Sequence, residues 1–271
     1  MKIKLSLILL TILLIPIALS PWIAQDSSVI DLNNRLLPPS AGHLLGSDEL
    51  GRDVLARLLA GGRISLAVAS ATAILAALLG TTVGLIAGWR GGWWDAGLMR
   101  LTDGIISLPL LPLLIVLAAV DPIRLGVPAP LVASEGFAIA RLIVIIAVVG
   151  WTTVARLVRA QTLTVKARDH VRAAVALGVS PTKIVLRHIL PHVSSPILVA
   201  TTMSMGGIIL TESALSFLGL GVRPPVASWG NMLSGAMDLV WSAPLLALWP
   251  GIAIFMTVLA VSLLGDGLNE R

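Results

Sequence analysis

Long apolar runs alternate with short polar segments along most of the chain. A helix needs roughly 20 mostly apolar residues to cross a bilayer, and the chain contains six runs of about this length. They cover about residues 3–23, 64–87, 98–120, 137–155, 193–215 and 245–264. The pattern therefore predicts an all-α membrane protein with six transmembrane helices.

The first apolar run fits either a transmembrane helix or a cleaved signal peptide. It follows Lys2 and Lys4, and Ala18 and Ser20 have the small-x-small spacing of a cleavage site. Pro21 directly after that spacing argues against cleavage. We therefore expect the run to be retained as the first span.

Basic residues between the runs indicate the direction of the spans, because cytoplasmic loops retain Lys and Arg. If the N-terminus lies inside, 12 of the 19 basic residues fall on the cytoplasmic side, and all four lysines are among them. Six spans then return the C-terminus to the same side. We expect cytoplasmic termini and a cytoplasmic segment between the fourth and fifth runs.

The composition agrees with a membrane protein and excludes several other classes. Of the 271 residues, 56% are hydrophobic and 12% are charged, and the mean hydropathy is +0.96. The net charge of +5 does not indicate nucleic acid binding, because the basic residues lie between apolar runs. The lack of cysteine excludes disulfides and thiol catalysis. Four scattered histidines argue against a structural zinc site.

The segment between the fourth and fifth runs predicts two short helices joined by a sharp turn. The first covers residues 166–177, and Gly178 can take the positive φ found just past a helix end. Ser180-Pro181 can start a second helix, which Pro191 should end. A capped hairpin of this kind favours a docking surface, although its basic residues could instead only fix topology and contact lipid headgroups.

A segment before the second run predicts a separate amphipathic helix on the outer surface. Ser47 can cap it, the two acidic residues that follow suit its positive end, and Gly61-Gly62 can end it. Asp53 and Arg57 can pair across one turn. Such a helix should lie on the surface as a brace for the second span.

The residues after the fifth run predict a structured loop at the bilayer edge. They combine several glycines with Pro224-Pro225 and with Trp229, a residue type that is frequent at membrane interfaces.

Polar residues inside the runs are candidates for a translocation path. Ionisable groups are costly in a membrane and should face protein or water, whereas hydroxyl groups could also serve as interhelical hydrogen bonds. The candidates are Asp103, Ser107, Thr201, Ser204, Met205, Thr211 and Glu212. Pro109 and Pro112 should kink the third span, and Gly206-Gly207 could mark close helix packing or a hinge.

The spacing of Ala173-Ala174, Gly178 and Leu190-Pro191 resembles the cytoplasmic EAA loop of permease subunits in binding-protein-dependent ABC importers. In that family the two-helix loop is the coupling helix that sits in a groove of the ATPase. The residues that the resemblance implies for ATPase coupling are Arg172, Ala173, Ala174, Leu177, Gly178, Val179, Ser180, Pro181 and Lys183.

Two positions of this loop depart from the family pattern. Arg172 stands where the family usually has Glu before the paired alanines, and His188 stands where it usually has Ile. Both spacings of the motif hold. The contacts made by the family's Glu are therefore not assigned to Arg172.

Two further stretches resemble the second permease subunit of dipeptide, oligopeptide and nickel importers. Residues 46–57, GSDELGRDVLAR, resemble GTD-x-x-GRD-x-x-x-R, with Ser47 in place of Thr, and residues 215–233 resemble LSFLGLG-x-x-PP-x-x-x-WG-x-ML. The residues implied for an external gate or for docking of the binding protein are Asp48, Arg52, Asp53, Arg57, Ser216, Phe217, Gly219, Gly221, Pro224 and Trp229.

The resemblance implies a multi-pass subunit of the inner, or plasma, membrane that forms a heterodimer with a homologous permease. Two ATP-binding subunits and an external binding protein complete the importer. Short peptides are the expected cargo, and nickel or a nickel chelate is the alternative. We divide the chain into residues 1–62, with the first span and the amphipathic segment, and a five-helix core of residues 63–271, with the coupling loop at about 161–191.

The chain lacks G-x-x-x-x-G-K-[ST], the loop that cradles nucleotide phosphates. We expect no enzymatic activity and no bound cofactor or metal, with ATP and magnesium on the partner subunits. A membrane enzyme would need a convergent catalytic set, and an ion-coupled secondary transporter should have inverted repeats. The sequence contains neither, and a purely structural subunit would not explain the hairpin.

Overall fold

The computed structural model describes residues 2–23 and 26–270, and this part of the chain is built from helices without β-strands. Within these described residues, five helical stretches are long and apolar enough to cross a membrane. They are α1 (Lys2–Ile23), α2 (Val54–Arg90), α6 (Glu135–Lys166), the continuous stretch Pro181–Phe217 that contains α9 (Leu190–Phe217), and α11 (Leu245–Asn269).

The third predicted span is broken into two helices, α3 (Gly92–Ser107) and α4 (Leu110–Ala119), which meet at 94°. Pro109 is the N-cap of α4. Proline is tolerated at a helix start but not in a helix interior, because it lacks the N–H that bonds the preceding turn. The expected kink is confirmed, and with this pair as one span the helices number six.

Short helical segments connect the long ones. They are η1 (Leu32–Asn34), η2 (Pro122–Leu125), α5 (Ala129–Val132), α7 (Asp169–Ala176), α8 (Pro181–Ile184), the π-helical segment η3 (Val185–Ile189), α10 (Trp229–Ala236) and η4 (Met237–Leu239).

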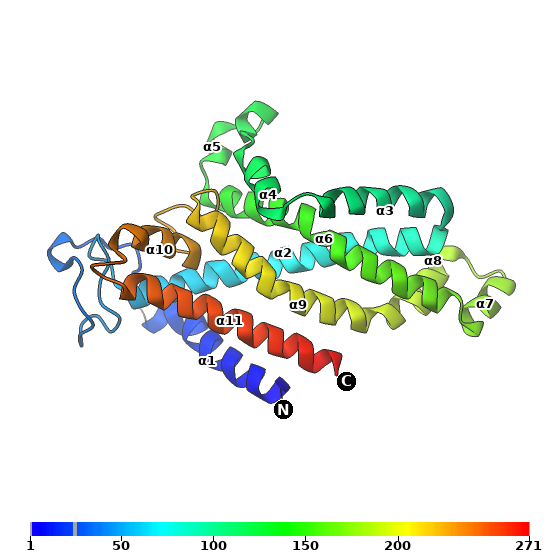
Figure 1. Ribbon diagram of the computed structural model, residues 1–271, viewed down its shortest axis with the longest axis horizontal. Coiled ribbons are helices and arrows are strands. Elements are labelled where there is room, and N and C mark those ends of the chain that lie inside the picture. Colours follow the sequence, from blue (N-terminus) through cyan, green and yellow to red (C-terminus); the bar gives the residue numbers. More distant parts are fainter. Residues whose placement is uncertain (1, 24–25, 271) are drawn as a thin grey trace.

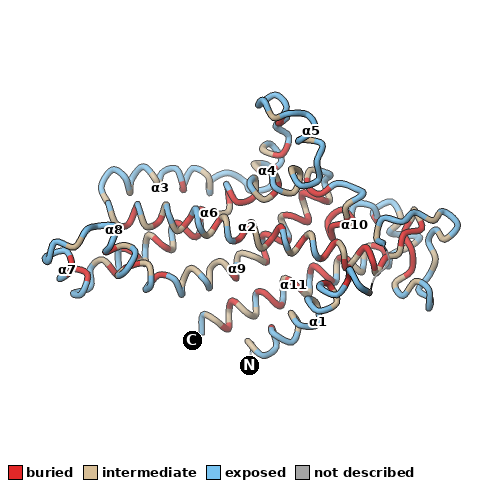
Figure 2. The backbone as a smooth tube through the Cα atoms, turned by 180° about the vertical axis from the view of Figure 1, so that it is seen from behind, coloured by how far each residue is buried: buried red, intermediate tan, exposed pale blue. Residues whose placement is uncertain are grey.

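The long helices form an elongated bundle with different structures at its two ends (Figure 1). The loop of residues 26–53 and α10 lie at one end, and α7 lies at the other. The ends of α1 and α11 lie side by side, with the Lys2 ammonium 3.9 Å from the Asp266 carboxylate. Buried residues follow α2, α6 and α9, whereas α3, α5 and α7 are mostly exposed (Figure 2).

Helices α2 and α6 pack backbone to backbone along a stripe of glycines on α2. Gly80, Gly84 and Gly88 are four residues apart and therefore share one helix face. A Cβ atom on Gly80 would lie 2.6 Å from the carbonyl oxygen of Trp151, and one on Gly84 would lie 2.6 Å from that of Ala155. No side chain fits there, so the two helices approach as closely as small-xxx-small motifs allow.

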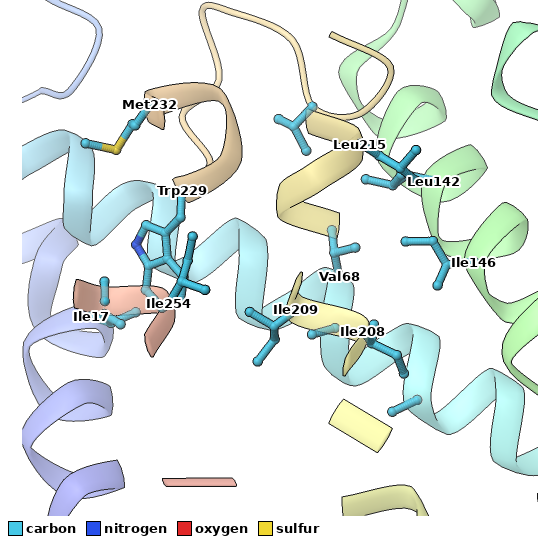
Figure 3. Close-up of a cluster of buried hydrophobic side chains, with 14 of the residues drawn as sticks. Ile17, Val68, Leu142, Ile146, Ile208, Ile209, Leu215, Trp229, Met232 and Ile254 are labelled. Carbon is cyan, nitrogen blue, oxygen red and sulfur yellow. The ribbon is translucent and has the colours of Figure 1, made fainter. Parts of the chain in front are cut away.

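The largest buried cluster joins α10 to the bundle (Figure 3). Trp229 is 1% exposed and packs beside Ile254. Its Nε1 donates to the carbonyl of Leu58 at 2.9 Å. Trp229 therefore faces the interior of the protein, where the bundle satisfies both its ring and its N–H.

The separate amphipathic helix expected before the second span does not form, so this prediction is wrong. The preceding residues form turns, and α2 begins at Val54 with the Asp53 carboxylate as its N-cap. The helix continues through Gly61 and Gly62. These glycines make room for α10, since a Cβ on Gly62 would lie 2.9 Å from the ring of Trp229. The domain boundary expected at this point falls inside α2.

The glycine stripe predicts that one added methyl group at Gly84 weakens the bundle. Gly84→Ala should lower the stability of the purified protein by about 1–3 kcal/mol, the usual range for overpacking. The matched control is Gly251→Ala on α11, where a Cβ meets no atom within 4 Å. Thermal unfolding in one detergent measures both. A Gly84→Ala midpoint equal to that of the control would contradict the packing.

Candidate functional site

The segment between α6 and α9 forms a helical hairpin, here called the α7–α8 hairpin (residues 167–184). Helix α7 ends in a Schellman turn: the N–H of Gly178 bonds the carbonyl of Val175 at 3.0 Å, and the N–H of Val179 bonds that of Ala174 at 3.1 Å. Gly178 has a φ of +76°. The helix end expected at this glycine is confirmed.

The second helix of the hairpin differs from the prediction, because Pro191 does not end it. Helix α8 passes through η3 directly into α9, and Pro191 lies in the first turn of α9. A proline cannot bond the carbonyl four residues earlier, and the wider π turn before it accommodates that loss. Ser180 is the N-cap of α8, but its side chain makes no capping bond. The hairpin thus continues into a long helix.

The inner face of the hairpin is a small apolar core of its own. Val171 and Ala174 of α7 pack with Ile184, Ile189 and Val193. Val179 is half-buried and packs against this core. The remaining candidate coupling residues are exposed: Arg172, Ala173, Leu177, Gly178, Ser180, Pro181 and Lys183. Leu177 at the tip is 83% exposed, so a rigid turn presents a large apolar side chain at this end of the bundle.

Charged groups fasten the base of the hairpin to the neighbouring helices. The Lys166 ammonium at the end of α6 donates to the carbonyl of Trp89 in the last turn of α2, at 2.5 Å. A cation at a helix C-terminus also interacts favourably with the helix dipole. Arg159 of α6 forms a two-pronged ion pair with Asp95 of α3 at 2.5 and 2.6 Å. Helices α2, α3 and α6 are therefore tied together next to the hairpin.

The candidate path residues do not form one group in this chain. Asp103 pairs with Arg156 of α6 at 2.5 Å, and α3 packs against α2 and α6, whereas the other stripe lies on α9. Met205 is half-buried against the main core. The hydroxyl groups bond carbonyls of their own helices at 2.7 to 2.9 Å, at Ser107, Thr201, Ser204 and Thr211.

Glu212 is fully buried, as expected for a carboxylate that faces protein. It accepts a hydrogen bond from the hydroxyl of Ser216 at 2.8 Å. The Ser216 oxygen in turn accepts one from the N–H of Val222 at 3.1 Å. Glu212 therefore joins α9 to the loop that follows it, and it reaches no surface of this chain.

A buried charge cluster holds the segment before α2. The Asp48 carboxylate lies 2.7 Å from Nε of Arg52 and 3.4 Å from Nε of Arg57. Asp53 instead bonds Nδ1 of His43 at 2.9 Å. The predicted pairing of Asp53 with Arg57 is therefore wrong, because Asp53 is used as the N-cap of α2 and Arg57 turns to Asp48.

The loop after α9, residues 218–228, is held by a residue that the sequence reading missed. Asn231 donates to the carbonyls of Val222 and Val226 at 3.2 and 2.7 Å. With Ser228 it also forms a capping box at the start of α10. The three-residue spacing of these two side chains is the signal that could have identified them.

The structure brings many of the external candidates together from distant parts of the sequence. One cavity is lined by Asp48, Arg52, Arg57, Ser216, Gly219 and Pro224. The other external candidates do not line it. Asp53 caps α2, Trp229 is buried against the bundle and Phe217 is half-buried. Gly221 packs against Ser216, because a Cβ on Gly221 would lie 2.2 Å from the Ser216 hydroxyl.

Comparison with known proteins identifies the family. Residues 80–271 match the family described as "Binding-protein-dependent transport system inner membrane component". The chain is 42% identical over 265 residues to the glutathione transport system permease protein GsiD of Shigella flexneri serotype 5b (strain 8401). It is 40% identical to the proteins of that name from Escherichia coli O6:K15:H31 (strain 536 / UPEC) and Shigella boydii serotype 4 (strain Sb227).

These alignments cover 97% of this chain and 83% of each relative. The family match covers most of the chain and includes α6, the hairpin, α9 and α11. The chain therefore belongs to the inner membrane components of binding-protein-dependent transport systems and is a multi-pass ABC importer permease of the peptide and nickel family.

Proposed function

We propose that the chain is one of two permease subunits of an ATP-driven importer that takes up short peptides from an external binding protein. The observation that carries this proposal is the α7–α8 hairpin, whose rigid turn exposes Leu177. An apolar side chain exposed beyond a packed core suits insertion into a groove on a partner. The two ATP-binding subunits would provide that groove and would bind the ATP and magnesium.

The orientation of the subunit follows from the same assignment. The hairpin and both termini would lie in the cytoplasm, and residues 26–53 would lie outside. The lysines support this orientation, because cytoplasmic ends of spans retain basic residues. Neither the 26–53 loop nor α10 contains a lysine, and the four lysines are Lys2, Lys4, Lys166 and Lys183. A homologous permease would complete the pathway, since the path candidates of this chain do not meet one another.

Coupling would use the helices to which the hairpin is attached. Closure of the ATP-binding subunits would move the hairpin, which continues into α9 on one side and follows α6 on the other. These helices would tilt as rigid bodies between two packings. Glu212 and Ser216 would transmit the tilt of α9 to the 218–228 loop, to which they are hydrogen-bonded.

Short peptides are favoured as cargo because the relatives are named for the transport of glutathione, a tripeptide. Nickel has less support. The ring centroid of His170 lies 6.4 Å from that of His188 and 5.3 Å from that of His192. However, the described residues contain no group of three or more side chains arranged to hold a metal ion.

Uptake by the purified complex tests the cargo directly. The permease pair, the ATP-binding subunits and the binding protein are reconstituted in proteoliposomes with ATP inside. We expect accumulation of labelled glutathione or a labelled dipeptide and no accumulation of nickel. ATP-dependent nickel uptake without peptide uptake would contradict the proposal.

The docking role of the hairpin predicts a large effect of Leu177→Asp. If Leu177 is buried in the partner's groove, a charge at this position should reduce co-purification of the ATP-binding subunits at least tenfold, which is roughly the cost of losing an interface hot spot. Leu44→Asp is the matched control, because Leu44 is 63% exposed and belongs to the 26–53 loop, which lies at the opposite end of the bundle. Equal retention of the ATP-binding subunits by both variants would remove Leu177 from the interface.

The Schellman turn predicts that the hairpin needs a residue that tolerates positive φ at position 178. Gly178→Val should strain the turn by about 1–2 kcal/mol, whereas Gly178→Asn should be tolerated. A Cβ there meets no atom within 4 Å, so the effect is one of backbone strain. Trypsin cleavage at Arg172 and Lys183 should accelerate about fivefold or more in the valine variant. Equal rates for both variants would show that the turn is not required.

A further inference from the structure

A cavity of about 240 Å³ lies between the segment before α2 and the loop after α9. Residues of α10 and the start of α11 close its other sides. Besides the candidates named above, its lining includes Glu49, Val222, Arg223 and Asn231. The elements that line the cavity lie at the end of the bundle opposite the α7–α8 hairpin (Figure 1).

Arg57 lines this cavity, and one nitrogen of its guanidinium group has no partner in the described part of the chain. The residue is 4% exposed, and its Nε lies 3.4 Å from the Asp48 carboxylate. Its Nη1 is buried and has no hydrogen-bond partner among the described residues. Leaving a buried charged donor unsatisfied costs more free energy than the bond itself contributes. A native structure retains such a group where a ligand, ion or water completes it.

The other buried polar side chains of the cavity are already satisfied. The Ser216 hydroxyl donates to Glu212 and accepts from the N–H of Val222. The Asn231 amide donates to the carbonyls of Val222 and Val226. Of the described residues that line the cavity, Arg57 therefore offers the buried side-chain donor that is still available.

The charges of the lining favour an anion. Arg52, Arg57 and Arg223 face only two carboxylates, those of Asp48 and Glu49. The Asp48 carboxylate is occupied, because it also accepts from the N–H groups of Leu50 and Arg52 at 2.9 Å. Glu49 is 3.5 Å from Arg52, and neither carboxylate forms a hydrogen bond with Nη1 of Arg57. Arg223, which is exposed, is the third guanidinium group at the cavity.

We propose that this cavity binds a carboxylate group of the transported peptide, with Arg57 as the buried partner and Arg223 as the exposed one. The inference rests on the proposed peptide import and adds a recognition site within the permease. Guanidinium groups suit this ligand, because their N–H groups match the geometry of a carboxylate and stay charged. The volume of the cavity suits the carboxyl end of a peptide.

The test compares a labelled tripeptide that has a free C-terminal carboxylate with the same tripeptide as its C-terminal amide. Uptake of both is measured with the complete transporter in proteoliposomes. The acid-to-amide ratio of uptake rates is then compared between the wild type and each variant. Any preference of the binding protein itself cancels, since the binding protein is the same throughout.

Arg57→Gln should lower the acid-to-amide ratio about tenfold, as expected for one charge-assisted hydrogen bond. Arg223→Gln should lower the ratio about threefold. Because Arg223 is exposed, this variant should assemble normally, and it tests the inference if Arg57→Gln does not assemble. Arg63→Gln, which is on the same helix as Arg57 but does not line this cavity, should leave the ratio unchanged.

An unchanged ratio in Arg223→Gln and in any assembled Arg57→Gln transporter would overturn the inference. Equal slowing of acid and amide, with weaker docking of the binding protein, would also overturn it, because the carboxylate would then belong to the binding protein. If the wild-type transporter takes up neither peptide, the proposed function itself fails, and the inference fails with it.

Discussion

The close approach of α2 and α6 is the contact on which the rest of the structure depends. Within a membrane, apolar side chains gain little by leaving lipid for one another, so helices associate through packing and hydrogen bonds. The stripe of Gly80, Gly84 and Gly88 makes this possible, because α2 has no side chains where α6 approaches it. Helix α9 packs on both partners. The pair thus forms a spine, with the α7–α8 hairpin at one end and the arginine-lined cavity at the other.

Charged side chains secure the two ends of this spine in different ways. Near the hairpin, Nε and Nη2 of Arg159 each donate to one oxygen of the Asp95 carboxylate, and this two-pronged pair joins α3 to α6. At the cavity, the Asp48 carboxylate serves two guanidinium groups, and Nη1 of Arg57 remains without a partner among the described residues. The first arrangement is complete by itself, whereas the second is suited to receiving a ligand.

The apolar runs and the local turn signals predicted the spans, the break in the third span and the turn at Gly178, because these depend on neighbours in the sequence. Other features depended on distant contacts. Gly62 looked like a helix end but makes room for Trp229, which lies far away in the sequence. Trp229 looked interfacial but bonds Leu58, 171 residues earlier. The glycine stripe was readable from its spacing, whereas the choice of Asp48 as the partner of Arg57 was not, because Asp53 offered the same local pairing.

We propose that the ATP-binding subunits act on the membrane helices through the tip of the α7–α8 hairpin. Because the chain has no cysteine, a single cysteine at Leu177 gives one defined attachment point for a short thiol-reactive photo-crosslinker. In the assembled transporter, this position should yield a crosslink to an ATP-binding subunit, whereas a cysteine at Leu44 should yield none. A crosslink to an ATP-binding subunit from position 44 and none from position 177 would contradict the account.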